Sequence, residues 1–168
     1  MVQVEVMFRN LLFVGKPLVP GDSTPPDISV LDENGTKQDI GALLKKGLTL
    51  IYFFPKADTP GCTAQSCSLR DDFSTLKQKG VRIFGSSTDT PGEQKKFQEK
   101  YQLPFPLLAD TEGSLARAFG VPILLGMVKR QAFLIRDGKV IWSDPAASTR
   151  KQAQDVLHFL NNESQAGS

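Results

Sequence analysis

The sequence predicts an α/β fold in which helices flank a mixed central sheet. Short apolar stretches rich in β-branched residues alternate along the chain with longer stretches of helical spacing, which is typical of α/β layers. Residues 48–54 are apolar almost throughout and fit a strand buried on both faces, as in a parallel sheet. Near the end, two strand-like runs flank Asp137 and Gly138, and this hairpin signal adds antiparallel edges to the sheet.

In the N-terminal third of the chain, the sequence predicts one strand and one short helix. Residues 28–31 form the strand candidate, and the Asn-Gly pair at 34–35 is typical of a hairpin turn. We expect Asp39 to cap a helix that runs to Lys46, because its carboxylate can accept hydrogen bonds from the first free backbone N–H groups. Gly47 then ends the helix, since glycine readily adopts the left-handed conformation found there.

The buried strand at 48–54 leads toward the only two cysteines of the chain. Pro55 ends this strand, because proline cannot donate to a sheet ladder. A loop follows over residues 56–61, and residues 62–79 have the spacing of a helix that Gly80 ends.

The alternation of strands and helices continues through the middle of the chain. Residues 81–87 form a strand, and residues 91–101 a helix with a proline in its first turn. A short strand is expected at 105–109, and a helix at 112–119 that Gly120 ends.

The last elements are a hairpin and a helix. Residues 132–135 and 139–142 are the two hairpin strands. Ser148 or Thr149 is expected to cap a final helix that runs to Leu160. We therefore divide the chain into three parts, which are an N-terminal extension (1–20), a single domain (21–162) and a flexible tail (163–168).

Composition excludes several classes of function. The chain has 168 residues, of which 40% are hydrophobic and 23% charged, as expected for one globular domain. Its net charge of +2 and pI of about 8.5 argue against a nucleic-acid partner. No apolar run approaches the roughly 20 residues that cross a bilayer, so no membrane partner is expected. Residues 7–19 lack the long apolar region of a secretory signal, and we expect a cytoplasmic location, with a plastid or other organelle as the alternative.

The loop and helix start around Cys62 carry the chemistry. Ligands of open α/β sheets bind beyond the carboxyl ends of strands, which is where this loop lies. Cys62 falls in the first turn of the helix, where unpaired N–H groups and the helix dipole favour a negative charge. Both effects favour the thiolate, which is the reactive form of cysteine.

Helical spacing separates the two cysteines. Cys62 shares a stripe with Leu69 and Leu76, which face the core, whereas Cys67 lies about 140° around the helix on a polar, outward face with Asp71. An intact helix holds the two Cα atoms about 8–9 Å apart, and a disulfide needs roughly 4.4–6.8 Å. The cysteines therefore either never bridge, or bridge only when the first turns unwind.

The residues leave other interpretations of the two cysteines. Two small buried apolar residues are the simplest alternative. A zinc site needs four ligands, and His158 is the only histidine, so we expect no metal. Phosphate-binding glycine motifs are absent from the sequence, and no cofactor is expected.

The motif Pro55-x-x-x-Thr59-x-x-Cys62 resembles the active-site signature of the peroxiredoxins. The longer string Phe-Pro-Lys-Ala-Asp-Thr-Pro-Gly-Cys-Thr-x-x-x-Cys is similar to the peroxiredoxin Q group, also called bacterioferritin comigratory proteins, in which many members carry a second cysteine at the place of Cys67. The resemblance runs from about residue 26 to residue 160 and includes Arg130, which matches the active-site arginine of the family. It implies a thioredoxin-like fold.

The resemblance also implies a role for each matched residue. Cys62 is the peroxidatic cysteine, which a hydroperoxide oxidises to sulfenic acid. Cys67 is the resolving cysteine, which forms the redox disulfide Cys62–Cys67. Thr59 holds the peroxide oxygen, and Arg130 stabilises the thiolate and the transition state. Pro55 shields the sulfenic acid from water.

Two backbone groups and the partners complete the implied mechanism. The N–H groups of Gly61 and Cys62 donate to the peroxide. The substrates implied are hydrogen peroxide and organic hydroperoxides, and the reductant is thioredoxin or a similar dithiol. A monomer is expected, with a dimer as the alternative.

Two rival functions stay open from the residues alone. One is a redox sensor or thioredoxin-like binding protein that uses the Cys62–Cys67 pair as a switch, and the other is a non-catalytic α/β module. Residues 1–20 extend beyond the resemblance. Residues 123–129 are apolar and loop-like where the family varies, and we expect them either to line the pocket or to form a dimer contact.

Overall fold

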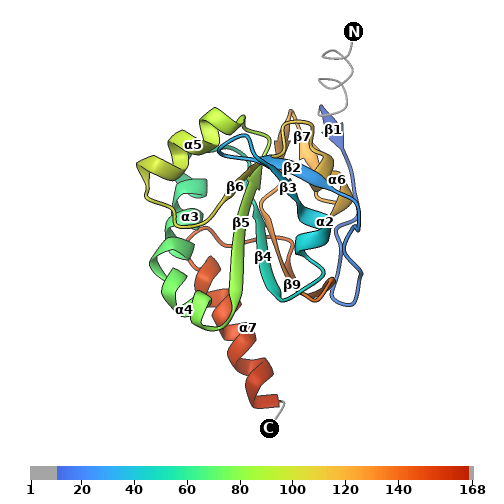
Figure 1. The fold of residues 1–168 in the computed structure, drawn as a ribbon, viewed down its shortest axis with the longest axis vertical. Coiled ribbons are helices and arrows are strands. Elements are labelled where there is room, and N and C mark those ends of the chain that lie inside the picture. Colours follow the sequence, from blue (N-terminus) through green and yellow to red (C-terminus); the bar gives the residue numbers. More distant parts are fainter. Residues whose placement is uncertain (1–10, 167–168) are drawn as a thin grey trace.

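The computed structural model describes residues 11–166. The predicted extension at 1–20 and tail at 163–168 therefore lie partly outside the described residues. The chain folds into layers, with helices on both faces of a central sheet (Figure 1). The predicted α/β architecture with a mixed sheet is confirmed.

Seven strands form the central sheet. The three in its middle, β4, β5 and β6, run parallel, and all other neighbours pair antiparallel. In spatial order the strands are β10 (Lys139–Asp144), β9 (Gln131–Arg136), β4 (Leu48–Phe53), β5 (Val81–Ser87), β6 (Leu107–Ala109), β2 (Ser29–Asp32) and β3 (Lys37–Asp39).

Six helices are described in residues 11–166, and they cover the two faces of the sheet. The first face is covered by α3 (Pro60–Asp71), α4 (Phe73–Gln78), α5 (Pro91–Lys100) and α7 (Gln152–Ala166). The second is covered by α2 (Ile40–Leu43) and α6 (Ser114–Ala118), as Figure 1 shows. Every residue of β4 is buried, and its successive side chains point alternately into the two cores, as predicted for a strand covered on both sides.

A second, small sheet lies beside the main one. It consists of β1 (Leu12–Phe13), β7 (Ile123–Leu124) and β8 (Met127–Val128), all paired antiparallel. The sequence suggested only a loop at residues 123–129, and that expectation was wrong. Leu125 and Gly126 both adopt positive φ, which makes the tight two-residue turn of a β-hairpin.

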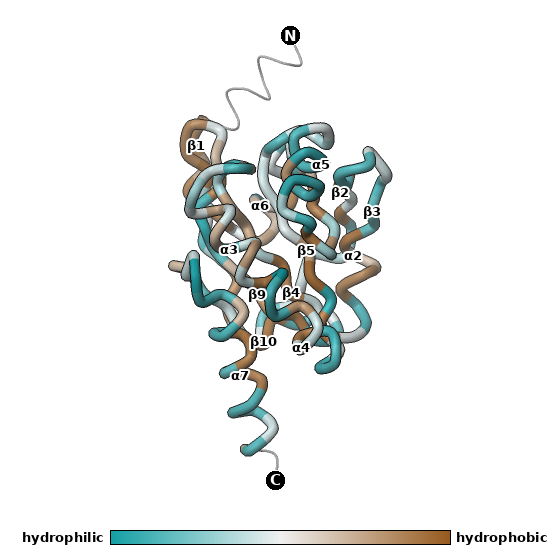
Figure 2. The backbone as a smooth tube through the Cα atoms, turned by 90° about the vertical axis from the view of Figure 1, so that its left-hand side faces the viewer, coloured by the Kyte–Doolittle hydropathy of each residue, from teal (hydrophilic) through white to brown (hydrophobic). Residues whose placement is uncertain are grey.

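This small sheet exposes apolar side chains. Figure 2 shows that the residues around β1 are hydrophobic and lie at the edge of the molecule. The large apolar side chains exposed on it and next to it are Leu11, Leu12, Val14, Leu124, Leu125 and Met127.

Several predicted helices have other bounds in the structure. The helix expected to run to Lys46 ends at Leu43, and the one expected at 112–119 is Ser114–Ala118. The helix expected at 62–79 begins earlier, at Pro60, and is interrupted at Asp72, where ψ is 13° and the backbone leaves helical geometry. Aspartate is a weak helix former in the interior of a helix, so the pair of aspartates at 71–72 is a natural place for the break.

The last helix begins at Gln152 rather than just after its expected cap, although Ser148 accepts a hydrogen bond from the backbone N–H of Lys151. It continues past Leu160 to Ala166, because no helix-breaking residue occurs before Gly167. An ion pair between Arg136 and Glu163 joins this last part to β9. None of the described helices has the length and apolar character needed to span a bilayer.

Candidate active site

Cys62 lies at the junction of β4 and α3. The strand ends at Phe53, a loop carries residues 54–59, and Thr59 is the extended N-cap residue of the helix. Pro60 occupies the first helical position, where its missing N–H costs no hydrogen bond. The side chain of Cys62 is therefore in the first turn, and it is buried, with 1% exposure.

Arg130 reaches this turn from a distant part of the sequence. Nη2 of Arg130 donates to Sγ of Cys62 at 3.3 Å. The contact follows from the sheet register, because β4 pairs antiparallel with β9 and Phe53 lies opposite Gln131. The residue just before β9 is thus brought beside the residues just after β4. A fixed positive charge at this distance favours the ionised form of the sulfur.

Two buried glutamines hold the guanidinium group of Arg130. Nη1 of Arg130 donates to Oε1 of Gln65 at 2.6 Å, and Nε2 of Gln65 donates to Oε1 of Gln152 at 2.7 Å. Both glutamines have 0% exposure. They fix the orientation of a long, flexible side chain that would otherwise have many rotamers.

These glutamines were not among the residues predicted from the sequence. The sequence could have indicated that Gln65 lies near Cys62, because a residue three positions later is on the same face of a helix. No pattern in the sequence indicated Gln152, since the packing of α7 against α3 brings it into contact with Gln65. That packing also brings the backbone N–H of Ala153 to Oγ of Ser68 at 3.3 Å.

Gly61 leaves room for the arginine. A Cβ atom at this position would stand 3.0 Å from Nη2 of Arg130 and 3.4 Å from Cγ2 of Thr149. Because the guanidinium is already bound to Cys62 and Gln65, it has little freedom to move aside. A side chain at residue 61 would therefore displace the group that contacts the sulfur.

Thr59 and Pro55 lie in the loop between β4 and α3. Oγ1 of Thr59 donates to the backbone carbonyl of Lys56 at 2.7 Å, so its lone pairs stay available to accept a hydrogen bond. Pro55 is half-buried and lines an apolar groove of about 350 Å³. The other residues that line the groove are Pro122, Leu124, Met127, Val128 and Lys129.

A buried hydroxyl pair lies beneath the helix. The hydroxyls of Tyr52 and Ser66 are 2.9 Å apart, and both side chains have 0% exposure. Burial raises the pKa of Tyr52 far above its ordinary value, and so the phenol stays neutral. It supports the first turns of α3 without adding a charge next to the sulfur.

Cys67 lies on the same helix, five residues after Cys62, and both thiols are free. Helical spacing predicted an outward, polar face for it, but its side chain is half-buried. Neighbours approach this side of the helix as well, since Arg70, three residues further on, donates to the backbone carbonyl of Tyr101 at the end of α5. Among residues 11–166, no group of three or more potential metal ligands occurs.

Comparison with known proteins finds a matching family and similar sequences. The model of the AhpC/TSA family matches residues 20–143. The chain is 39% identical over 152 residues to the peroxiredoxin Bcp of Escherichia coli K12, covering 86% of this chain and 96% of that protein. It is 37% identical over 144 residues to the chloroplastic peroxiredoxin Q of Gentiana triflora, covering 83% of this chain but 66% of that longer protein.

Solved structures are similar as well. The crystal structure of the peroxidoxin BcpB from Mycobacterium tuberculosis superposes with a TM-score of 0.78 at 35% identity, covering 85% of this chain and 96% of that one. A bacterioferritin comigratory protein from Xanthomonas campestris superposes with a TM-score of 0.77 at 25% identity, covering 86% and 99%. Alkyl peroxide reduction activity is described for that Xanthomonas protein.

Proposed function

The chain belongs to the AhpC/TSA family, and on this basis we propose that it is a thiol-specific peroxidase of the peroxiredoxin Q and Bcp type. It has the thioredoxin-like fold of its solved relatives, with helices on both faces of a mixed sheet. The observation that carries the proposal is the 3.3 Å contact of Arg130 with the sulfur of Cys62 in the first turn of α3. Such an enzyme has a role in antioxidant defence and redox homeostasis.

The first half of the reaction oxidises Cys62. Its thiolate attacks the terminal oxygen of the hydroperoxide, so an S–O bond forms while the O–O bond breaks. The sulfur becomes sulfenic acid, and the departing oxygen takes a proton and leaves as water or an alcohol. Arg130 and the N–H groups of Gly61 and Cys62 stabilise the charge that moves along the O–O bond.

Thr59 and Pro55 position and protect the reacting atoms. The Thr59 hydroxyl accepts a hydrogen bond from the hydroperoxide, and its own bond to the Lys56 carbonyl holds it in that orientation. Pro55 shields the oxidised sulfur from water. The apolar groove that begins at Pro55 fits the organic part of an alkyl hydroperoxide, so organic hydroperoxides are substrates together with hydrogen peroxide.

The second half of the reaction forms the Cys62–Cys67 disulfide. Sγ of Cys67 attacks the sulfenic sulfur, an S–S bond forms, and the oxygen leaves as water. Both cysteines lie within one helix, whose geometry keeps their Cα atoms about 8–9 Å apart. The first turns of α3 must therefore unwind before the roughly 4.4–6.8 Å of a disulfide is reached. The enzyme is thus an atypical 2-Cys peroxiredoxin.

A thiol reductant must then restore both cysteines. A dithiol such as thioredoxin does this by thiol–disulfide exchange, through a mixed disulfide with one of the two sulfurs. The unwound segment exposes the disulfide to such a partner. We further propose that the protein acts as a monomer in the cytoplasm.

The test is a peroxide assay on two serine variants. C62S is expected to abolish peroxide reduction, because the attacking atom is lost. C67S is expected to keep the first oxidation at its full rate, but to lose turnover with thioredoxin, because the disulfide cannot form. Stopped-flow kinetics and mass analysis of the products distinguish the two steps. Full turnover by C62S would contradict the proposal, and turnover by C67S would show that Cys67 has no resolving role.

A further inference from the structure

Asp58 occupies a strained position in the loop before α3. Its φ is 58°, in the left-handed region that residues other than glycine adopt rarely and at a cost. Its carboxylate accepts hydrogen bonds from Nζ of Lys100 at 2.8 Å and from the hydroxyl of Tyr101 at 2.7 Å. These two bonds hold the pKa of Asp58 below its ordinary value, so the side chain is ionised in this contact.

Tyr101 is also bonded to the other end of the cysteine-bearing helix. Its backbone carbonyl accepts from Nη1 of Arg70 at 2.9 Å, in the last turn of α3. Its ring packs edge-on against Phe97 at 5.5 Å, and Phe97 is buried in the core. One firmly placed residue at the end of α5 thus contacts the chain on both sides of Cys62 and Cys67.

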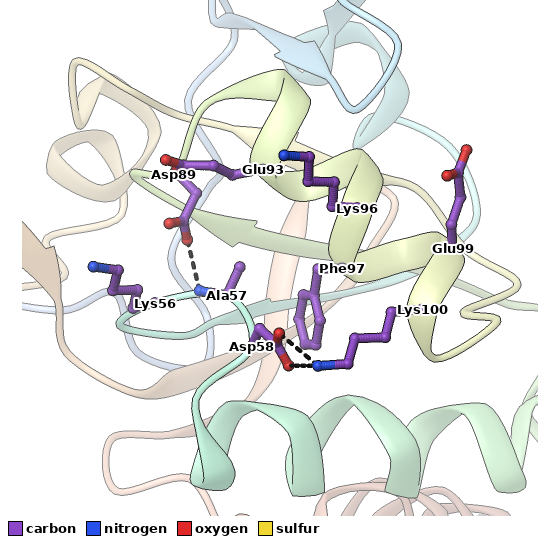
Figure 3. A pocket seen from close by; sticks show the side chains of 9 residues that line it. All are labelled: Lys56, Ala57, Asp58, Asp89, Glu93, Lys96, Phe97, Glu99 and Lys100. Carbon is purple, nitrogen blue, oxygen red and sulfur yellow. Dashed lines mark hydrogen bonds and ion pairs between the residues drawn. The ribbon is translucent and has the colours of Figure 1, made fainter.

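Beyond the ring contact of Phe54 with Phe97 at 5.8 Å, the outer part of the loop meets α5 mainly through polar contacts. A cavity of about 690 Å³ lies between them, and Figure 3 shows Asp58 reaching Lys100 along its edge. The second attachment is at the opposite end of the cavity, where Oδ2 of Asp89 accepts from the backbone N–H of Ala57 at 2.7 Å. Because a cavity separates Asp58 from most of α5, the position of Asp58 itself depends largely on its polar contacts with Lys100 and Tyr101.

We propose that Asp58, Lys100 and Tyr101 form a latch that controls how readily the first turns of α3 unwind for disulfide formation. The inference rests on the proposed function, in which this unwinding brings Cys67 to the oxidised Cys62. While the latch is closed, the helix stays intact and Cys62 remains beside Arg130. When it opens, Asp58 can relax to negative φ, and the backbone before Cys62 is free to move.

The latch sets the competition between two fates of the sulfenic acid. In one, Cys67 attacks and water leaves. In the other, a second hydroperoxide molecule oxidises the sulfur to sulfinic acid, and that hydroperoxide is reduced to water or alcohol. A tighter latch favours the second fate, because the sulfur stays longer in the folded site. These three residues are positioning residues, since they do not touch the substrate.

The experiment weakens the latch in three separate ways. D58N keeps a residue that tolerates positive φ but removes the charge, K100M removes the cation, and Y101F removes the hydroxyl. K100R keeps the cation and serves as the conservative variant. K96M is the matched control, because Lys96 lines the same cavity outside the latch. Circular dichroism checks that each variant is folded.

Rapid mixing with hydrogen peroxide separates the two chemical steps. The rate of Cys62 oxidation and the rate of disulfide formation are followed by quenching and mass analysis. D58N, K100M and Y101F are expected to form the disulfide about two- to fivefold faster, the range that an exposed ion pair can supply. The peroxide concentration that gives half sulfinic acid should rise by the same factor, while K100R and K96M resemble the unchanged protein.

Equal or slower disulfide formation in the three latch variants would overturn the proposal, as would an equal effect of K96M. A merely structural role would lower the rates of both steps together, and so would also contradict it. Failure of the proposed function looks different, because then the unchanged protein itself would form neither sulfenic acid nor a disulfide.

Discussion

The two cysteines share one helix but have different surroundings. Cys62 is buried in the first turn, and its sulfur accepts a hydrogen bond from Arg130, which Gln65 and Gln152 hold in place. Cys67 lies five residues further on and is half-buried. Cys62 thus lies beside the positive charge of Arg130, and no such contact with Arg130 is formed by Cys67 in the described residues.

The difference shows that the position of a cysteine along the helix does not by itself determine its reactivity. The helix start favours an anion for any cysteine in the first turn. What separates Cys62 from Cys67 is the set of groups that reach it from β9 and α7, far away in sequence. Three substitutions, taken in order of decreasing effect, test how much each of these groups contributes.

Removing the charge beside Cys62 should have the largest effect. R130M is expected to lower the second-order rate of peroxide reaction by about 10²–10³, the usual loss when one preorganised donor to a developing charge is removed. The alkylation rate of Cys67 in C62S should not change, because the arginine bonds only to the surroundings of Cys62. Stopped-flow kinetics measures the first rate and mass analysis the second.

K129M is the matched control for this change. Lys129 precedes Arg130 and is exposed, so its loss alters the local charge equally without touching the sulfur. A similar fall in K129M would show that general electrostatics, rather than the specific contact, distinguishes the two cysteines.

Removing the support of the arginine should have an intermediate effect. Q65L is expected to lower the peroxide rate about tenfold, because the guanidinium loses its fixed orientation. It also leaves the side-chain oxygen of Gln152 buried without a partner, which costs about 1–3 kcal/mol of stability. Denaturant unfolding measures the stability. Q154L, at an exposed position of α7, is the control and should change neither quantity. An unchanged peroxide rate in Q65L would mean that Arg130 needs no support.

A single added methyl group should have the smallest effect. In G61A the new Cβ meets Nη2 of Arg130 at 3.0 Å, so the guanidinium shifts by a few tenths of an ångström and the peroxide rate falls about threefold. G92A adds the same methyl group in α5, where nothing lies within 4 Å, and should leave the rate unchanged. If both variants kept the full rate, the close fit at residue 61 would have no part in catalysis.

Much of the main sheet was predictable because its strands carry local signals. The strand predicted at 81–87 coincides with β5, and the buried strand at 48–54 differs from β4 by one residue. Asp39 accepts from the backbone N–H of Ala42, as expected for the cap of a short helix. In these cases the apolar pattern or the cap is sufficient, since the tertiary structure reinforces the local preference.

The errors fall where local signals are weak. The hairpin β7–β8 has only two-residue strands and one glycine, so no periodicity identified it. The half-burial of Cys67 depends on the elements that pack around α3, which spacing within one helix does not reveal. The division into extension, domain and tail stays a prediction.

Local sequence alone specifies the junction of strand, loop and helix that carries Cys62, and the helical spacing that keeps Cys67 out of reach. These properties are set by apolar pattern, proline, glycine and the geometry of an α-helix. The groups that surround the sulfur are instead specified by the assembled fold, because Arg130 arrives through the β4–β9 register and Gln152 through the packing of α7. Contacts between segments 68 or 87 residues apart depend on how sheets and helices assemble, and no local pattern encodes that.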